Sequence, residues 1–329
     1  RPRRSGSPLQ TLPDLPGAVR EPVTALLRPR FLWSSLALAL LAVGAFWASG
    51  IVGLAAHQLA MRGTSTATPT LSLSSYHVGI EGQPIAGLDD NTSGLTFSPA
   101  TGTLFTAINR PAELAELSPD GQLLRRIPLT GASDVEGITH VEGDRFILVD
   151  EGHHRLSWVT ITPETTGIDL AAVPFLTLDL GAFKNMGFEG ISWDQRRKEL
   201  VIVQEMWPVR VLVIGGLDRA VMGQGLGVTV REWQPDSWAG HFVTDLSSVT
   251  LHDATGNMLL LSDMSSMLAE YDPDGAPISL MTLWSGWHGL TGSVPQAEGV
   301  AIGPDGAVFI VSEPNLFYRF DPEVPLSQP

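Results

Sequence analysis

One motif occurs five times along the chain, and its recurrence restricts the possible folds more than any other feature. Each copy has a small residue and an aliphatic residue, then a turn, then an apolar run that ends at a polar pair. A period of about 40 to 60 residues built from short strands and Gly/Asp turns is typical of a β-propeller. The copies are NTSGLTFSPATGTLFTAINR from Asn91, DVEGITHVEGDRFILVDEG from Asp134, GFEGISWDQRRKELVIVQEM from Gly187, DLSSVTLHDATGNMLLLSDM from Asp245 and QAEGVAIGPDGAVFIVSEP from Gln296.

The residues between the copies supply the remaining strands. Residues 114–129 and 267–284 each read as two strands joined through Asp-Gly, a favoured hairpin turn. The last copy has a third strand at 316–321 and too few residues after it for a fourth. LSLSSYHV (71–78) is the expected donor, because pairing the two chain ends removes an exposed sheet edge. The sequence therefore predicts an all-β, five-bladed β-propeller over residues 71–329, with six blades as the alternative.

A long uncharged stretch precedes the propeller. From Phe31 to Ala56 no residue carries a charge, and about 20 apolar residues span a bilayer core. Six arginines come before this stretch and one, Arg62, follows it, so the positive-inside rule places the propeller in the periplasm. A cleaved signal peptide and a buried soluble helix are the alternatives. We expect a cytoplasmic Pro/Arg-rich tail at 1–30, a single transmembrane helix that acts as an inner-membrane signal anchor at 31–61, and a linker at 62–70.

Charge and cysteine content exclude several classes of function. Residues 1–62 have a formal charge of +5 and the remaining residues −20, so the body of the protein repels phosphate backbones and nucleic acid is a poor partner. Cations and basic protein surfaces suit it better. The chain has no cysteine, which excludes disulfides, thiolate zinc sites and a cysteine nucleophile.

Equivalent positions of the five copies form rings around the axis of a propeller. The residue before the small one is glutamate in three copies, and three confined carboxylates repel one another unless they are protonated or bridged by a cation. Calcium prefers such oxygen ligands. Asn91, Asp134, Asn185 and Asp245, a few residues earlier, could add oxygens. The alternative is that the glutamates only cap backbone amides. The sequence predicts a calcium site formed by Ser93, Glu136, Glu189, Ser247 and Glu298.

A second ring of equivalent polar residues lies at the end of the next strand, and we expect its acidic members to be solvated side chains on the surface. Its members are Asn109, Glu151, Glu205, Asp263 and Glu313. His153 and His154 could supply a base, although adjacent residues of a strand point to opposite faces and the sequence assigns them no partner.

The five copies together resemble the SdiA-regulated family of bacterial membrane-anchored propellers. The resemblance covers about residues 71–321 and rests on SGLTFSPATGTLF, SDVEGITHVEGDRFILVDE, FEGISWD and AEGVAIGPDG. It implies a five-bladed propeller behind an N-terminal membrane segment, a bound calcium ion and a distant kinship to NHL-repeat proteins. It implies no established activity. The fourth copy departs, with Asp-Leu-Ser-Ser-Val where the others have Glu-Gly or Ser-Gly, which puts a complete ring of ligands in doubt.

Three functions fit these observations. The first is a non-enzymatic, calcium-binding interaction or scaffold subunit that presents an acidic face to a protein partner, such as a membrane complex. The second is a calcium-dependent hydrolase of esterase, lactonase or phosphoester type, in which the ion polarises an oxygen and activates water. The third is a sensor for a small ligand. An open coordination position beside a pocket and a base would favour the enzyme.

Overall fold

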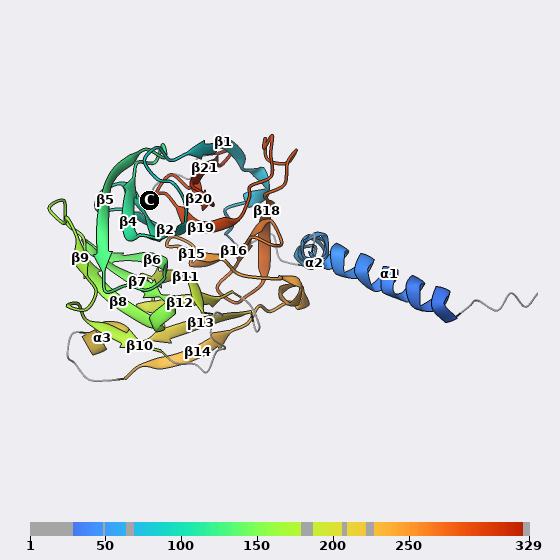
Figure 1. Cartoon of the computed structure of the whole chain (residues 1–329), viewed down its shortest axis with the longest axis horizontal. Helices are drawn as coiled ribbons and strands as arrows, with labels where there is room; N and C mark the ends of the chain where they lie inside the picture. Colours follow the sequence, from blue (N-terminus) through green and yellow to red (C-terminus); the bar gives the residue numbers. More distant parts are fainter. Residues whose placement is uncertain are drawn as a thin grey trace, which may run out of the picture. The chain divides into compact units, whose positions relative to one another are not determined.

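The computed structural model describes residues 29–48, 50–63, 69–178, 187–205, 209–221 and 227–324. The chain divides into two compact units, Arg1–Val43 and Gly44–Pro329. The second unit contains five sheets arranged as blades around a central axis (Figure 1), so the predicted five-bladed propeller is confirmed. The described residues form no sixth blade.

Each blade begins at the axis and proceeds outward through antiparallel strands. The innermost strands are β2 (Thr92–Ser98), β6 (Val135–Glu142), β11 (Phe188–Asp194), β15 (Ser248–His252) and β19 (Ala297–Ile302). The second strands are β3 (Thr103–Asn109), β7 (Arg145–Asp150), β12 (Glu199–Gln204), β16 (Asn257–Ser262) and β20 (Val308–Ser312). The third are β4 (Ala112–Leu117), β8 (Arg155–Thr160), β13 (Arg210–Gly215), β17 (Met267–Tyr271) and β21 (Leu316–Asp321). The outer strands are β5 (Leu123–Thr130), β10 (Phe175–Thr177), β14 (Thr229–Trp233), β18 (Pro277–Thr282) and β1 (His77–Pro84), and β9 (Ile168–Asp169) pairs parallel with β5.

The small residue of the repeat is required where innermost strands meet. Each innermost strand contacts the innermost strands of both neighbouring blades. A Cβ on Gly137 would lie 2.5 Å from the Glu189 carbonyl oxygen, and one on Gly190 would lie 2.5 Å from the Cα of Ser248. Backbone atoms cannot rotate away as a side chain can, so the close approach of adjacent blades selects glycine at these positions.

The second strands are largely apolar and buried because both faces of each sheet pack against a neighbouring blade. In β7 every residue after Arg145 is buried. Phe105 of β3 and Phe146 of β7 belong to one core cluster and have ring centroids 4.9 Å apart, so this cluster joins two blades. Five such clusters lie among the described residues.

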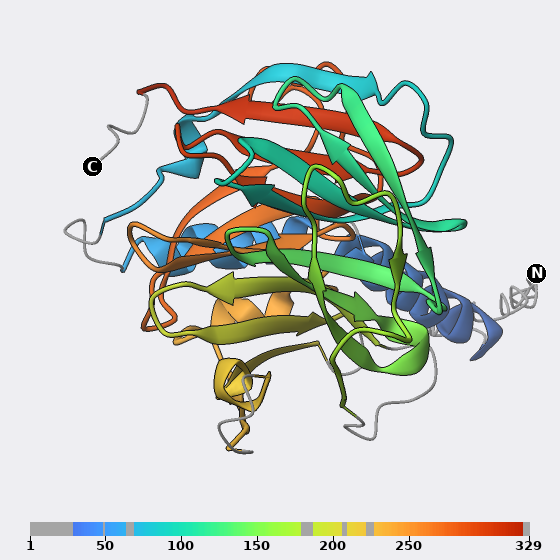
Figure 2. The same ribbon diagram turned by 90° about the vertical axis from the view of Figure 1, so that its left-hand side faces the viewer.

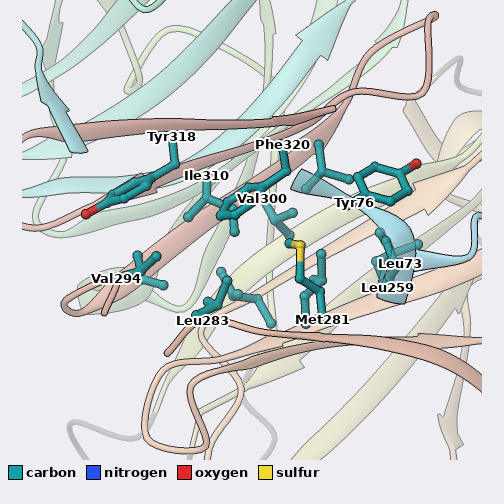
Figure 3. Close-up of a cluster of buried hydrophobic side chains, with 14 of the residues drawn as sticks. Leu73, Tyr76, Leu259, Met281, Leu283, Val294, Val300, Ile310, Tyr318 and Phe320 are labelled. Atoms are coloured by element: carbon teal, nitrogen blue, oxygen red, sulfur yellow. The ribbon is translucent and has the colours of Figure 1, made fainter. Parts of the chain in front are cut away.

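The N-terminal segment closes the last blade. β1 pairs antiparallel with β21, and the two strands lie side by side in Figure 2. The closing strand is His77–Pro84, several residues later than the expected 71–78, because residues before it form a 3-10 turn, η1 (Leu73–Ser75). Figure 3 shows Leu73 and Tyr76 from this segment beside Met281 and Phe320, which belong to two different blades.

A buried carboxylate also fastens this segment to the fourth blade. Glu270 is fully buried and accepts hydrogen bonds from the Leu71 amide at 2.9 Å and the Thr70 hydroxyl at 2.7 Å. Asn257 Nδ2 and Ser279 Oγ, from the same blade, donate to it at 2.6 and 2.5 Å. These donors compensate the cost of burying the charge.

The uncharged stretch before the propeller forms two helices, α1 (Pro29–Ala48) and α2 (Ile51–Met61), and Gly50 between them has a φ of 71°. Among the described residues, no helix is both long enough and apolar enough to cross a membrane. The tail at 1–28 and most of the linker, 64–68, lie outside the described residues. A short helix, α3 (Leu217–Val221), follows β13.

Helix α2 packs against the fourth blade, although it falls within the span expected at 31–61. His57 is fully buried; its Nδ1 lies 2.8 Å from the Gly53 carbonyl oxygen and its Nε2 lies 2.5 Å from the Tyr271 hydroxyl. Because a carbonyl oxygen can only accept, Nδ1 carries the proton and Tyr271 donates to Nε2.

Candidate functional site

Irregular strand pairing displaces the three glutamates of the ring from regular positions. Val135 and Gly137 pair with consecutive residues of β7, which leaves Glu136 between them without a partner position. Glu298 is displaced in the same way in β19, and the pairing of β11 shifts across Glu189. A β-bulge redirects side chains and often occurs beside functional sites. In the fourth blade β15 pairs without a shift and Ser247 precedes the strand, which is the structural consequence of its divergent copy.

The three ring glutamates are largely enclosed at the end of the axis where the innermost strands begin. Burial raises the pKa of Glu189 well above its usual value, and the neighbouring glutamates of both rings raise it further. Burial, followed by Glu313 and Asp263, raises the pKa of Glu298 to about 8. Burial likewise raises the pKa of Glu136, although hydrogen bonds oppose it. The site therefore stores electrostatic repulsion that a cation or protons would relieve.

The second ring belongs to the same site. Antiparallel pairing brings the end of each second strand back to the start of the innermost strand, so Glu151, Glu205, Asp263 and Glu313 are half-buried rather than fully solvated. Burial is the first cause of the raised pKa of all four carboxyls. The interpretation of this ring as surface acids was wrong, because the sequence shows strand ends but not how closely the blades converge there.

Within the described residues, one group of carboxylates has metal-ligand spacing. One oxygen each from Asp134, Glu136 and Glu151 lie within 4.8 Å of one another. The copy from Asp134 contains all three residues. The sequence analysis predicts Glu136 as a ligand and Asp134 as a possible further one, but it places Glu151 in the second ring. Glu189 and Glu298 lie outside this group.

Two oxygens, one within this group and one beside it, are buried and have no hydrogen-bond donor in the described part of the chain. Asn109 Nδ2 donates to Glu136 Oε1 at 2.9 Å, which fixes the amide and leaves Asn109 Oδ1 without a donor. Asp134 Oδ1 is also without a donor, and the nearest cation, Arg110, is 3.9 Å away. Buried oxygens that lack donors are the ligands a hard cation such as calcium requires.

The two ring serines have different surroundings. Ser93 Oγ donates to Glu136 Oε2 at 2.6 Å, so it holds a candidate ligand in place. Ser247 Oγ donates to the Ala297 carbonyl oxygen at 2.6 Å and links two blades. Asp245 binds the amides of Asp263 and Met264. Asn185 lies outside the described residues.

A histidine–aspartate pair adjoins the carboxylate group. His153 lies in a 3-10 turn, η2 (Glu151–His153), and not in a strand as the sequence argument assumed. Its Nδ1 lies 2.8 Å from Oδ2 of Asp150, which is buried and also accepts from the amides of Ser133 and Asp134. The carboxylate assigns the proton to Nδ1 and leaves Nε2 as the basic nitrogen. This partner was missed because Asp150 reads as the end of an apolar run.

Solved structures with a similar fold include enzymes of several kinds. A streptogramin B lyase is 11% identical, with 76% of this chain and 99% of that chain covered and a TM-score of 0.45. The glutaminyl cyclase of Myxococcus xanthus is 15% identical, with 74% and 95% covered and a TM-score of 0.49. A luciferin-regenerating enzyme is 12% identical, with 74% and 95% covered and a TM-score of 0.46.

The family model described as SdiA-regulated matches residues 69–321, which contain all five blades. This agrees with the resemblance of the repeat copies. The chain belongs to the SdiA-regulated family.

Proposed function

We propose that this protein is a calcium-binding propeller that acts as a non-enzymatic interaction subunit. The observation that carries the proposal is the enclosed group of Asp134, Glu136 and Glu151. Two buried oxygens lack donors there, Asp134 Oδ1 within the group and Asn109 Oδ1 beside it. Calcium takes about six to eight oxygen ligands and tolerates irregular geometry. Its charge would offset the burial and the mutual repulsion that raise the pKa of the surrounding glutamates.

Thermal unfolding of the full chain tests calcium binding. A ligand at about 100 times its Kd stabilises the folded state by about 2.7 kcal/mol, so calcium should raise the midpoint by several degrees over chelator. Glu136→Gln should abolish most of this rise. Glu164→Gln, at an exposed position, is the matched control and should keep it. An equal rise in wild type and Glu136→Gln would contradict the proposed site.

The partner proposed for this subunit is a protein with a basic surface, because residues 63–329 have a formal charge of −20. Chemical crosslinking of the full chain in isolated membranes, with calcium and with chelator, examines this point. A discrete adduct that disappears in high salt supports a charged partner, whereas an uncrosslinked chain under all conditions contradicts it.

We propose further that the part of the expected 31–61 anchor that lies in α1, residues 31–48, holds the chain at the inner membrane with the propeller on the periplasmic side. The charge asymmetry around this stretch supports the proposal, as do the exposed apolar side chains of α1, such as Leu38 and Leu41. Carbonate extraction and protease accessibility in spheroplasts test it. Release of the chain by carbonate, or a protected propeller, would refute it.

A calcium-dependent hydrolase is the second candidate, and the Asp150–His153 pair favours it. His153 Nε2 would take a proton from water, and the hydroxide would attack a cation-polarised ester carbon. Collapse of the tetrahedral adduct would expel the alkoxide, which would recover the proton from His153. The products are an alcohol and a carboxylic acid, which then ionises and releases its proton to solvent.

Hydrolysis of p-nitrophenyl acetate by the full chain distinguishes the two candidates. His153→Gln should lower a calcium-dependent rate by about 100-fold or more, as expected for loss of a general base. His154→Gln changes the adjacent residue and should have little effect. No calcium-dependent hydrolysis, or equal rates in the two variants, would eliminate this role of His153.

A further inference from the structure

An apolar pocket lies between the third and fourth blades, which are neighbours in the ring of Figure 1. Its volume is about 440 Å³, within the range of about 300 to 1,000 Å³ that is usual for small-molecule sites. Its walls come from β13 and β14, from β16 and β17, and from the segment that connects the two blades. Among the described residues that line it, none belongs to either axial ring, so the pocket is separate from the carboxylate site.

The walls of this pocket are mainly apolar. Their side chains include Val209, Val211, Trp233, Val243, Leu246 and Leu260. Val211, Leu246 and Leu260 are at most 6% exposed and belong to the core cluster that joins the two blades. The pocket therefore reaches into the core between the blades, where proteins rarely leave space unfilled.

The polar groups that these walls contain already have partners. The Tyr271 hydroxyl donates to His57 Nε2, and Thr244 Oγ1 lies 2.9 Å from Ser265 Oγ. A polar ligand group buried among the apolar side chains would lose its hydrogen bonds to water without replacement, which costs free energy, whereas a hydrocarbon group would gain from leaving water. The inner part of the pocket therefore selects hydrocarbon.

The two aromatic rings of the described lining do not form a slot for a flat molecule. Trp233 and Tyr271 meet edge to face, with ring centroids 5.4 Å apart and an angle of 85° between the ring planes. A flat aromatic ligand gains most by stacking on ring faces that lie parallel to it. Aliphatic side chains from both blades can pack around an alkyl chain instead, so an alkyl chain fits this lining better.

Two opposite charges lie at the mouth of the pocket. Arg210 and Glu232 line it with side chains that are 38% and 42% exposed, and Arg210 Nε lies 3.9 Å from Glu232 Oε2. A ligand head with a net charge is attracted by one of these residues and repelled by the other. It therefore receives no net attraction that would offset the loss of its hydration.

The apolar walls and the balanced mouth together define a class of ligand. We propose that this pocket binds the hydrocarbon chain of an amphiphile whose head carries no net charge. The chain lies among the aliphatic side chains of the two blades, and the head stays in water beside Arg210 and Glu232.

Photoaffinity labelling of the full chain with an octanol that carries a photoreactive diazirine tests the proposal. Mass spectrometry of the labelled peptides should find adducts on the pocket wall, within residues 209–211, 232–235 or 243–246 or at Leu260. Decanol should prevent this labelling at an about 16-fold lower concentration than octanol, because each buried methylene tightens binding by about fourfold. Decanoate has the same number of carbons and a charged head, and it should compete more weakly than decanol.

Substitutions that fill the pocket supply the second comparison. Val243→Phe enlarges the wall on the connecting segment, and Val209→Phe enlarges it on the third blade. Each should reduce labelling of the remaining wall by about tenfold or more, because the added ring takes the place of the chain. Val230→Phe adds the same ring on β14 at a position that is 44% exposed and outside the described lining, and it should be labelled as wild type is.

Three results would overturn the pocket as an alkyl-chain site. They are adducts confined to other parts of the chain such as α1, equal competition by octanol and decanol, and full labelling of the pocket in a folded Val243→Phe or Val209→Phe variant. Circular dichroism melts identify which variants fold, and the two substitutions lie on different walls, so either one suffices. The assay depends on neither calcium nor a partner protein, so its result is independent of the function proposed above.

Discussion

At single positions of the repeat, titratable glutamates and closely packed glycines lie side by side. The glutamate ring places several carboxyls in an enclosed volume, and Ser93 and Asn109 hold Glu136 by donating to it. Glycines in the same motif, such as Gly137 and Gly190, admit the neighbouring strands at distances that no side chain tolerates. The Glu-Gly dipeptide of the repeat therefore has two roles. The glutamate contributes a carboxyl to the site, and the glycine allows adjacent blades to pack closely.

The raised carboxyl pKa values predict how stability depends on pH without calcium. When the pKa of a carboxyl is higher in the folded state, the folded state binds its proton more tightly than the unfolded state does. The contribution of that carboxyl to the free energy of unfolding is therefore greatest below its unfolded pKa and falls as pH rises. For Glu298 the free energy of unfolding should fall between about pH 4.5 and about pH 8, by at most about 1.4 kcal/mol per pH unit. Urea denaturation in chelator across this range measures it.

Glu298→Gln provides the comparison for this pH experiment, because it removes the titrating group and keeps the shape. The variant should lose less stability than wild type between pH 4.5 and pH 8. Parallel curves for the two proteins would show that Glu298 is ionised at no cost in the folded state.

At the scale of elements, the position of helix α2 is determined by contacts with residues far away in the sequence. Helix α2 is apolar and uncharged and could have been part of a longer helix. Instead Gly50 approaches Ser265 so closely that a Cβ would lie 2.6 Å from the Ser265 carbonyl oxygen, and His57 is buried against Tyr271. A helix that docks through small residues and one buried polar group depends on that group.

Tyr271→Phe should loosen helix α2 selectively. The substitution removes the donor to His57 Nε2 and leaves a buried acceptor unsatisfied, at a cost of about 1 to 3 kcal/mol. Amide exchange within Ile51–Met61 should accelerate by about 5- to 150-fold, since local opening follows this free energy. Tyr318→Phe, in the last blade, should leave exchange in α2 unchanged. Equal exchange in wild type and Tyr271→Phe would show that the bond contributes nothing.

At the scale of the whole molecule, the propeller depends on pairing its first strand with its last. β1 completes the last blade, and Glu270 fixes the residues just before it. Without β1, the backbone groups on the outer edge of β21 would lack a pairing strand. The closing strand therefore removes an exposed sheet edge.

Two truncated chains should therefore behave differently. A chain that begins at residue 69 keeps β1 and should unfold in one cooperative transition. A chain that begins at residue 85 lacks β1 and the buried Leu73 and Tyr76, and should aggregate or lose cooperativity. Size-exclusion chromatography and circular dichroism melts compare them; similar melts would show that closure by β1 is dispensable.

The sequence alone determined the propeller, its five blades and the family, because each blade is a local unit whose turns and apolar runs recur in the chain. It also identified Glu136, Glu189 and Glu298 as equivalent positions. The tertiary structure decided which oxygens meet: Asp134 and Glu151 join Glu136, while Ser247 turns to Ala297. The structure also paired His153 with Asp150 and opened an apolar pocket between the third and fourth blades. Repeat spacing fixes which strand a residue occupies, but bulges and the convergence of blades at the axis fix its side-chain neighbours, and these depend on contacts between residues far apart in the chain.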